Sequence, residues 1–372
     1  MPLEKPVVYA YPIWHTVSFT LVAKKHIAYM REKWRVNVNE IDELAFPTFA
    51  PVSSPVAFVH PAIFIMNRVV ESKKDLRGEF RKEYFDWWKS HFSKLVGVDV
   101  CDSDRMSELG VSLLNLCDEV VTHSSFCVNV YEASGVKARI HRVPHGVDPE
   151  WLTMPNVWDS MPASSINPAV LQLYLYKVRK RKKVILFWLW HSGHRKGWDE
   201  VREAYERLRK ERDDVVLVLK TALPNPPEYQ QVMRLGAINV YGWLSDYDKM
   251  ALYDLADVNL NFSRGGGFEL NCLEALARGV PCISSDWGSW TDYVPPYLQV
   301  RRGRRVQPLP GNQIHVGYGY AVDVEKAVDK LHEVLDNIDE FKAKVMRWRE
   351  DVLSKEYRWD KVAWRLAWIA RH

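Results

Sequence analysis

Short apolar segments alternate with segments of helical periodicity along almost the whole chain, and this alternation constrains the fold more than any other feature. In the first half the predicted strands are Val7–Ala10, Val56–Val59, Val96–Val100, Glu119–Thr122 and Arg139–Arg142. In the second half they are Val184–Trp190, Val215–Lys220, Asn239–Tyr241, Val258–Phe262 and Val280–Ser284. Strands that alternate with helices form parallel sheets covered by helices. The sequence therefore predicts an α/β fold with doubly wound, Rossmann-like domains.

The length and one irregular segment indicate two domains. A chain of 372 residues that is 47% hydrophobic can bury two ordinary cores. The segment Met154–Pro168 is rich in Pro, Ser and Asn and is typical of a linker. We therefore predict an N-terminal domain over residues 1–165 and a C-terminal domain over residues 166–354. In two such domains facing across a cleft, a ligand binds at the carboxyl ends of the strands.

Cysteine usage and the N-terminus bear on the compartment. The five cysteines show no CxxC pair and no zinc spacing, and most lie in apolar runs: Cys101, Cys117, Cys127, Cys272 and Cys282. This pattern indicates buried free thiols in a reducing compartment. The N-terminus lacks the apolar core of a signal peptide, and no run approaches the ~18 apolar residues of a membrane span. The sequence predicts a cytoplasmic protein.

The segment Ser263–Asp286, SRGGGFELNCLEALARGVPCISSD, carries the clearest signal for a binding site. The glycines Gly265, Gly266 and Gly267 open directly onto a helical pattern over residues 268–278. A glycine loop that feeds a helix presents backbone N–H groups and the positive end of the helix dipole to an anion. Glu274 lies inside that helix, where it can reach a sugar hydroxyl. The segment indicates a nucleotide-sugar site, and the alternative is an ordinary loop–helix connection.

Two further strand ends in the second half add complementary chemistry. Arg195 and Lys196 follow the strand Val184–Trp190 and precede a helix that begins near Trp198. The turn Gly242-Trp243-Leu244 follows the strand Asn239–Tyr241. Cations, an aromatic side chain and an anion cradle at neighbouring strand ends fit a nucleoside diphosphate. We expect the diphosphate on the cations and the helix end, the base near Trp243 and the ribose on Glu274.

The second half resembles the donor domain of family-4-type glycosyltransferases with the GT-B fold. The resemblance rests on Arg195-Lys196-Gly197, on GFELNCLEALARGVPCISSD, on residues 117–151 and on the closing YRWDKVAWRL. It implies that the N-terminal domain takes the acceptor and that the last helix, in residues 355–372, packs back on it. It also implies a retaining, hexosyltransferase-like reaction that needs no metal and no other cofactor.

Carried over residue by residue, the resemblance assigns a donor site and a catalytic set. The catalytic residues would be Arg195, Lys196, Glu269 and Asp102. The donor-binding residues would be Gly265, Gly266, Gly267, Phe268, Leu270, Glu274, Trp243 and Leu244. Arg195 and Lys196 would contact the diphosphate of the donor.

The sequence departs from the family pattern at two places. The family carries a glutamate pair spaced E-x7-E, but here the first position is Gly266 and only Glu274 remains. Glu269, three residues after Gly266, either replaces the missing sugar contact or only solvates the helix start. In the N-terminal domain a His-acid pair expected near the cleft appears as Cys101-Asp102, and Asp102 is predicted to be an acceptor-side polar group.

These departures leave alternatives open for the function. The main interpretation is a glycosyltransferase that uses a nucleotide-sugar donor and an unknown glycan, lipid or protein acceptor. A catalytically inactive nucleotide-sugar binding protein and another GT-B reaction, such as epimerisation of a nucleotide sugar, are the alternatives. No nucleic-acid partner is expected.

The segment Phe80–Leu95 has two interpretations. It places Phe80, Tyr84, Trp87, Trp88, His91 and Leu95 broadly along one helical face, with lysines opposite. The first interpretation is an amphipathic helix that faces the core. The second is a helix in peripheral contact with an anionic membrane, which would place the protein at the inner membrane face.

Overall fold

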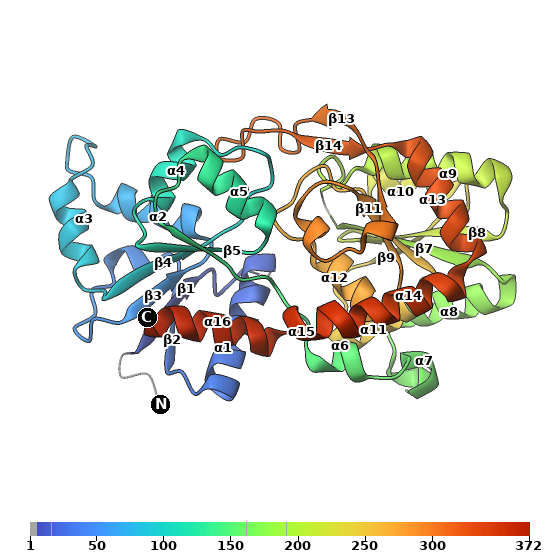
Figure 1. The fold of residues 1–372 in the computed structure, drawn as a ribbon, viewed down its shortest axis with the longest axis horizontal. Coiled ribbons are helices and arrows are strands. Elements are labelled where there is room, and N and C mark those ends of the chain that lie inside the picture. The colour runs from blue at the N-terminus through green and yellow to red at the C-terminus, as the bar shows by residue number, and fades with distance from the viewer. Residues whose placement is uncertain (1–5, 16, 161, 191) are drawn as a thin grey trace. The chain divides into compact units, whose positions relative to one another are not determined.

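The structure is a computed structural model that describes residues 6–15, 17–160, 162–190 and 192–372. The chain divides into two compact units, whose elements are labelled in Figure 1. Unit 1 comprises the chain up to Gly146 together with residues 311–317 and 356–372. Unit 2 comprises residues 147–310 and 318–355. Each unit is a doubly wound α/β structure around its own sheet.

Unit 1 contains a six-stranded parallel sheet in the order β2-β1-β3-β4-β5-β6. Its strands are β1 (Val7–Tyr11), β2 (Val38–Asp42), β3 (Val56–Val59), β4 (Lys94–Val98), β5 (Glu119–Thr122) and β6 (Arg139–Arg142). Its helices are α1 (Ser18–Trp34), α2 (Ala62–Ser72), α3 (Lys82–Lys89), α4 (Glu108–Leu114), α5 (Ser125–Ser134) and α16 (Trp359–Arg371), with the 3-10 turn η1 (Phe46–Thr48). The inner strands are almost continuously apolar because helices cover both faces of a parallel sheet.

Unit 2 contains a second six-stranded parallel sheet, in the order β12-β11-β10-β7-β8-β9, and the two-stranded antiparallel ribbon β13-β14. The strands are β7 (Lys183–Trp190), β8 (Val215–Thr221), β9 (Ile238–Tyr241), β10 (Val258–Asn261), β11 (Cys282–Ser285), β12 (Gln299–Val300), β13 (Arg302–Val306) and β14 (Gly319–Val322). The helices are α6 (Pro149–Thr153), α7 (Val157–Ser160), α8 (Pro168–Lys180), α9 (Trp198–Glu211), α10 (Pro227–Met233), α11 (Asp246–Leu255), α12 (Leu270–Ala277), α13 (Val324–Asp336) and α14 (Ile338–Trp348). Short helical turns lie at Ala163–Ser165, Ser289–Asp292, Pro296–Leu298 and Arg349–Leu353, and α15 (Ser354–Glu356) lies where the chain passes from unit 2 to unit 1.

All ten strands predicted from apolar runs are present, with ends that differ by up to two residues. The sequence missed β2, because this edge strand carries exposed polar residues in place of an apolar run. It also missed the strands that lie between residues 295 and 322. That region contains β12 and β13, and β14 lies at its end. These strands lie at the edge of a sheet or in a two-stranded ribbon, where they pair through the backbone and need no apolar pattern.

The predicted linker Met154–Pro168 is a folded part of unit 2. The Arg278 guanidinium donates to the carbonyl oxygens of Met154 at 2.9 Å and Pro155 at 3.0 Å. The same guanidinium is paired with Asp254, and both side chains are almost fully buried. These contacts hold the segment against α11 and α12, and the units divide at Gly146/Val147 although the sequence placed the boundary at 165/166.

The C-terminal helix α16 packs on α1 within unit 1, and the two helices lie side by side in Figure 1. The Trp34 Nε1–H donates to the Asp360 carbonyl oxygen at 2.9 Å. Lys94 of β4 donates to the carbonyl oxygen of Ile369 at 3.1 Å. Polar contacts at both ends therefore fix the helix on its own unit.

The helix α3 buries a different face from the predicted one. Phe85 and Trp88 are buried, and Trp88 meets Phe46 edge-on at 5.3 Å. Tyr84 and Trp87, predicted to share the face of Trp88, are exposed. The helix covers only residues 82–89, so the periodicity extrapolated from Phe80 to Leu95 is wrong.

The cations around α3 do not form a uniform basic surface. Four of them contact carboxylates: Lys74 with Glu71, Arg81 with Asp75, Lys82 with Asp86 and Lys89 with Asp118. Among the residues that the structure covers, no helix has both the length and the apolar character to cross a bilayer.

Four histidines are buried together in unit 1, and Tyr9 contacts two of them. The ring centroids of His123 and His145 are 3.9 Å apart, and those of His26 and His60 are 6.0 Å apart. The Tyr9 hydroxyl lies 2.8 Å from His26 Nδ1 and 3.3 Å from His60 Nδ1. Burial lowers the pKa of all four rings, that of His123 to about 4. The cluster is therefore neutral at pH 7.

This cluster makes the stability of unit 1 sensitive to acid. A histidine whose folded-state pKa is lowered gains protons in the unfolded chain first, so its contribution to stability is lost as the pH falls below about 6.5. Each such histidine lowers the free energy of unfolding by ~1.4 kcal/mol per pH unit in that window. Asp99, whose pKa burial raises to about 7, acts in the opposite direction, but it is one group against four.

We expect urea denaturation to show a steep loss of stability between pH 6.5 and pH 4.5, with a smaller slope in His123→Gln. A free energy of unfolding that stays constant from pH 7 to pH 5 would contradict the neutral cluster.

Candidate active site

The predicted diphosphate-binding segments lie side by side in unit 2 because they follow neighbouring parallel strands. Arg195 and Lys196 follow β7, and the glycine loop follows β10, which is hydrogen-bonded to β7. The Arg264 N–H donates to the Arg195 carbonyl oxygen at 2.7 Å. Gly197 has a φ of 74°, and a Cβ there would lie 2.1 Å from the Phe262 carbonyl oxygen. The two segments approach so closely that only glycine fits at this position.

The Glu269 carboxylate joins both predicted cations in one cluster. It accepts a hydrogen bond from Lys196 Nζ and pairs with Arg195 Nη1 at 3.3 Å. The Ser263 hydroxyl donates to the same carboxylate at 3.1 Å. The Glu269 side chain is only 2% exposed, whereas those of Arg195 and Lys196 are 21% and 12% exposed. The site therefore presents its cations toward solvent and its carboxylate inward.

Gly266 and Glu269 share one space. A Cβ at Gly266 would lie 2.5 Å from Glu269 Oε1 and 3.3 Å from Arg195 Nη1. A side chain at position 266 would therefore collide with the present position of the Glu269 carboxylate. The glycine in place of the family glutamate and the glutamate three residues later are physically coupled, and Glu269 does not merely solvate the start of α12.

Glu274 lies on α12 with its carboxylate directed to α11. It accepts hydrogen bonds from the Tyr253 hydroxyl at 3.0 Å and from Lys249 Nζ at 3.2 Å. Burial raises the pKa of Tyr253, and the neighbouring Glu274 raises it further. Burial lowers the pKa of Lys249, but Glu274 and Asp246 outweigh burial, so that its net shift is upward. The carboxylate is held in place by these two donors, and its ribose role stays a prediction.

The turn after β9 presents an aromatic side chain, as predicted. Trp243 is 56% exposed, whereas Leu244 is buried. Beneath the turn, Lys220 at the end of β8 donates to the Gly242 carbonyl oxygen at 2.5 Å, and its ammonium lies 4.8 Å from the Trp190 ring centroid. Burial lowers the pKa of Lys220 to about 8. The sequence analysis missed Lys220, although a lysine at the end of the apolar run VVLVLK was a signal for it.

Of the remaining predicted residues, Phe268 and Leu270 lie beside Glu269 in unit 2, and Asp102 lies in unit 1. Phe268 stacks on Tyr293 at 4.8 Å, and the Tyr293 hydroxyl donates to the Glu269 carbonyl oxygen at 2.9 Å. Leu270 is half-buried as the first residue of α12. Asp102 belongs to unit 1, where its backbone N–H donates to His315 Nδ1 at 3.3 Å.

Arg264 is a second residue that the sequence analysis missed. It is 1% exposed, and its guanidinium makes a bidentate pair with Glu200 and a 2.8 Å hydrogen bond to Asp199. Its Nη1 also lies 2.9 Å from His194 Nδ1. The Arg264 side chain therefore contacts residues before and after Arg195-Lys196, namely His194 on one side and Asp199 and Glu200 on the other. Its own backbone begins the glycine loop. Nothing in the sequence shows which way an arginine beside glycines will turn.

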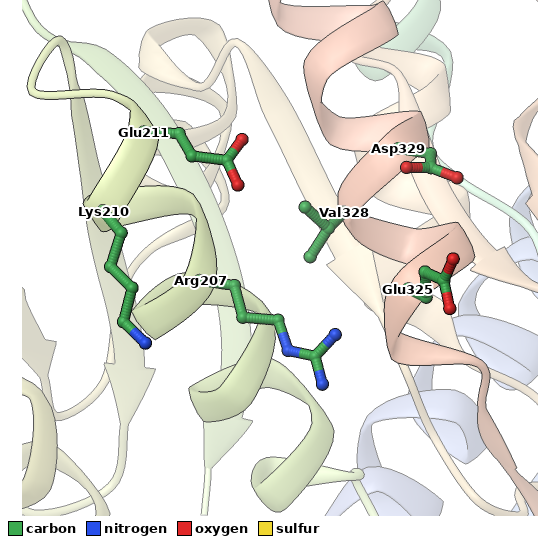
Figure 2. A pocket seen from close by; sticks show the side chains of 6 residues that line it. All are labelled: Arg207, Lys210, Glu211, Glu325, Val328 and Asp329. Carbon is green, nitrogen blue, oxygen red and sulfur yellow. The ribbon is translucent and has the colours of Figure 1, made fainter.

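A separate hollow of about 230 Å³ lies between α9 and α13 (Figure 2). It is lined by Arg207, Lys210, Glu211, Glu325, Val328 and Asp329, none of which is a predicted site residue. Its mixed charges favour no particular ligand. Within the described parts of the chain, no group of three or more His, Cys, Asp or Glu side chains is arranged to hold a metal ion.

Residues 182–303 match the family described as glycosyl transferases group 1. The chain is 33% identical over 351 residues to "Uncharacterized protein 356" of Sulfolobus islandicus rod-shaped virus 1, with 92% of each chain covered. It is 24% identical over 295 residues to "Putative glycosyltransferase 45" of a Sulfolobus islandicus filamentous virus, covering 74% of this chain and 76% of the relative. The crystal structure of a glycosyltransferase from Rickettsia africae matches with a TM-score of 0.63 at 12% identity, covering 99% and 98% of the two chains.

Removing the Arg264 guanidinium should destabilise unit 2. Arg264→Met removes the bidentate counter-ion of the buried Glu200 and leaves it the exposed Arg304 guanidinium at 3.6 Å. Loss of a buried counter-ion costs about 3–5 kcal/mol in the free energy of unfolding. Glu200→Met combined with Arg264→Met should recover most of that loss. Arg207→Met, which breaks an exposed pair with Glu203, is the matched control and should cost less than about 1 kcal/mol. Urea denaturation measures the free energy of unfolding of each variant. Equal losses in Arg264→Met and Arg207→Met would show that Arg264 does not stabilise unit 2 through its buried ion pair.

Proposed function

Since the chain belongs to the same family as protein 356 of the rod-shaped virus and is a glycosyltransferase of GT-B fold, we propose that it moves a hexose from a nucleoside diphosphate sugar to an acceptor. We propose that the reaction retains the anomeric configuration and needs no metal. The acceptor would be a glycan, lipid or protein. The protein would bind it in the cytoplasm or while in peripheral contact with the inner membrane face.

One observation carries this proposal: Arg195, Lys196 and the glycine loop meet at the carboxyl ends of adjacent parallel strands. Ligands of doubly wound sheets bind at such strand ends. Two partly exposed cations beside a helix N-terminus suit a diphosphate. As the glycosidic bond to the diphosphate breaks, negative charge builds on the leaving group, and fixed cations stabilise that charge more than they stabilise the bound donor.

The other predicted residues complete the donor site in this proposal. Glu274 would bind the ribose hydroxyls, and the exposed Trp243 would lie against the base. Glu269 would supply the sugar contact that the family places at position 266, since its carboxylate adjoins that position. We assign no nucleophile to the protein, and Asp102 would act on the acceptor side.

A panel of nucleotide sugars tests the function. We expect one or more donors to raise the melting temperature and to be hydrolysed slowly without an acceptor, in buffer that contains EDTA. Nuclear magnetic resonance of the released sugar would then report retention. Activity that EDTA abolishes and magnesium or manganese restores would overturn metal independence.

A second candidate is a nucleotide-sugar binding protein without turnover, and Gly266 is the observation that favours it. Tight donor binding with no hydrolysis or transfer across panels of donors and acceptors would establish this candidate in place of the enzyme.

Lys196→Ala should lower the rate more than the affinity for the donor. A fixed cation gains most in the transition state, so that its removal should raise the barrier by about 3 kcal/mol, or about 100-fold in turnover. Lys210→Ala, which removes an exposed lysine of α9, is the control and should leave turnover unchanged. Turnover of Lys196→Ala at saturating donor within about threefold of wild type would take Lys196 out of the mechanism.

A further inference from the structure

The carboxylate of Glu269 is bound to the same two cations that the donor diphosphate would use. We propose that Glu269 is an internal counter-anion: it pairs with Arg195 and Lys196 until a donor binds, and the diphosphate then takes its place on them. The inference rests on the proposed function and deepens it, because it gives Glu269 a role in binding and release as well as at the sugar.

The exposure of the three side chains supports an exchange of partners. The cations are partly exposed while the carboxylate is buried at 2%. An anion that arrives from solvent therefore reaches the guanidinium and the ammonium without passing the carboxylate. A diphosphate offers more charge and more acceptor oxygens than one carboxylate, so the cations gain by the exchange.

The backbone of Glu269 is fixed by Tyr293, so that an exchange of partners involves its side chain alone. The Tyr293 hydroxyl accepts from the Glu269 N–H at 3.1 Å and donates to its carbonyl oxygen at 2.9 Å. Gly266 allows the carboxylate to lie where it does, since a Cβ there would lie 2.5 Å from Oε1. A side chain at position 266 would therefore push the carboxylate away from its place beside Arg195.

A displaced carboxylate needs a new partner, because a buried charge that loses its counter-ions is costly. A hydroxyl of the transferred sugar can donate a hydrogen bond to it, whereas the nucleoside diphosphate product has lost that sugar and keeps only its ribose hydroxyls, which the proposal places at Glu274. The exchange therefore favours the intact donor over the nucleotide product. After transfer, Glu269 pairs with the cations again and assists release of the diphosphate.

The test is the affinity of Glu269→Gln for anions, measured by calorimetry with inorganic pyrophosphate and with the nucleoside diphosphate of the stabilising donor. Loss of the competing charge should tighten both affinities at least about tenfold, while the gain for the intact donor should be smaller and its turnover should fall. Ser263→Ala, which removes the uncharged partner of the same carboxylate, is the matched control and should stay within about threefold of wild type.

The pyrophosphate arm separates this inference from the proposed function. Tighter pyrophosphate binding in Glu269→Gln with no turnover of any nucleotide sugar keeps the counter-anion and removes the transferase. Unchanged or weaker pyrophosphate binding in Glu269→Gln, or none by either protein, overturns the counter-anion whatever the activity. If Glu269→Gln does not fold, Glu269→Asp, whose shorter side chain cannot keep both cations, should give the same tightening to a smaller degree.

Discussion

The buried clamp of Arg264 on Glu200 and Asp199 is the interaction on which the candidate site depends. The site consists of two loops from different strands, and loops have no ladder of hydrogen bonds to fix them. The buried Arg264 side chain fixes one loop to the other, because Arg264 begins the glycine loop and its guanidinium binds the first turn of α9. It also neutralises two carboxylates close to the proposed diphosphate site. Without it, the acidic first turn that suits the dipole of α9 would oppose a diphosphate.

The fold was predictable because its determinants are local and periodic. Buried parallel strands are apolar runs of the kind seen at Val215–Thr221, and they stand out from the helices between them. The strands β2, β13 and β14 were not predictable in this way, since they are held by backbone pairing at an edge or in a ribbon. The prediction of a linker at Met154–Pro168 was wrong for a related reason. Its composition is that of a loop, but Arg278, far away in the sequence, binds its carbonyl groups.

The site was predictable only where chemistry follows from position along a strand. Arg195, Lys196 and the glycine loop could be placed together because adjacent parallel strands end at one edge of the sheet. The partners of Glu269 could not, since they depend on side-chain direction. Arg264 and Lys220 were missed because a charged residue in a sequence is normally read as exposed. Both are buried, one on carboxylates and one among tryptophan rings and backbone carbonyls.

The glutamate pattern shows why a position-by-position comparison can mislead. Read alone, Gly266 is the loss of a catalytic carboxylate, and Glu269 is a bulky residue where the family often has glycine. In the structure the chain turns between the two positions, and Oε1 of Glu269 lies 2.5 Å from where a Cβ at position 266 would be. The Glu269 carboxylate thus adjoins the place that a side chain at position 266 would take. Glu269 is the N-cap residue of α12, and its carboxylate pairs with Arg195 and Lys196. In the proposed function this one side chain would therefore link the sugar contact to the charge of the diphosphate site.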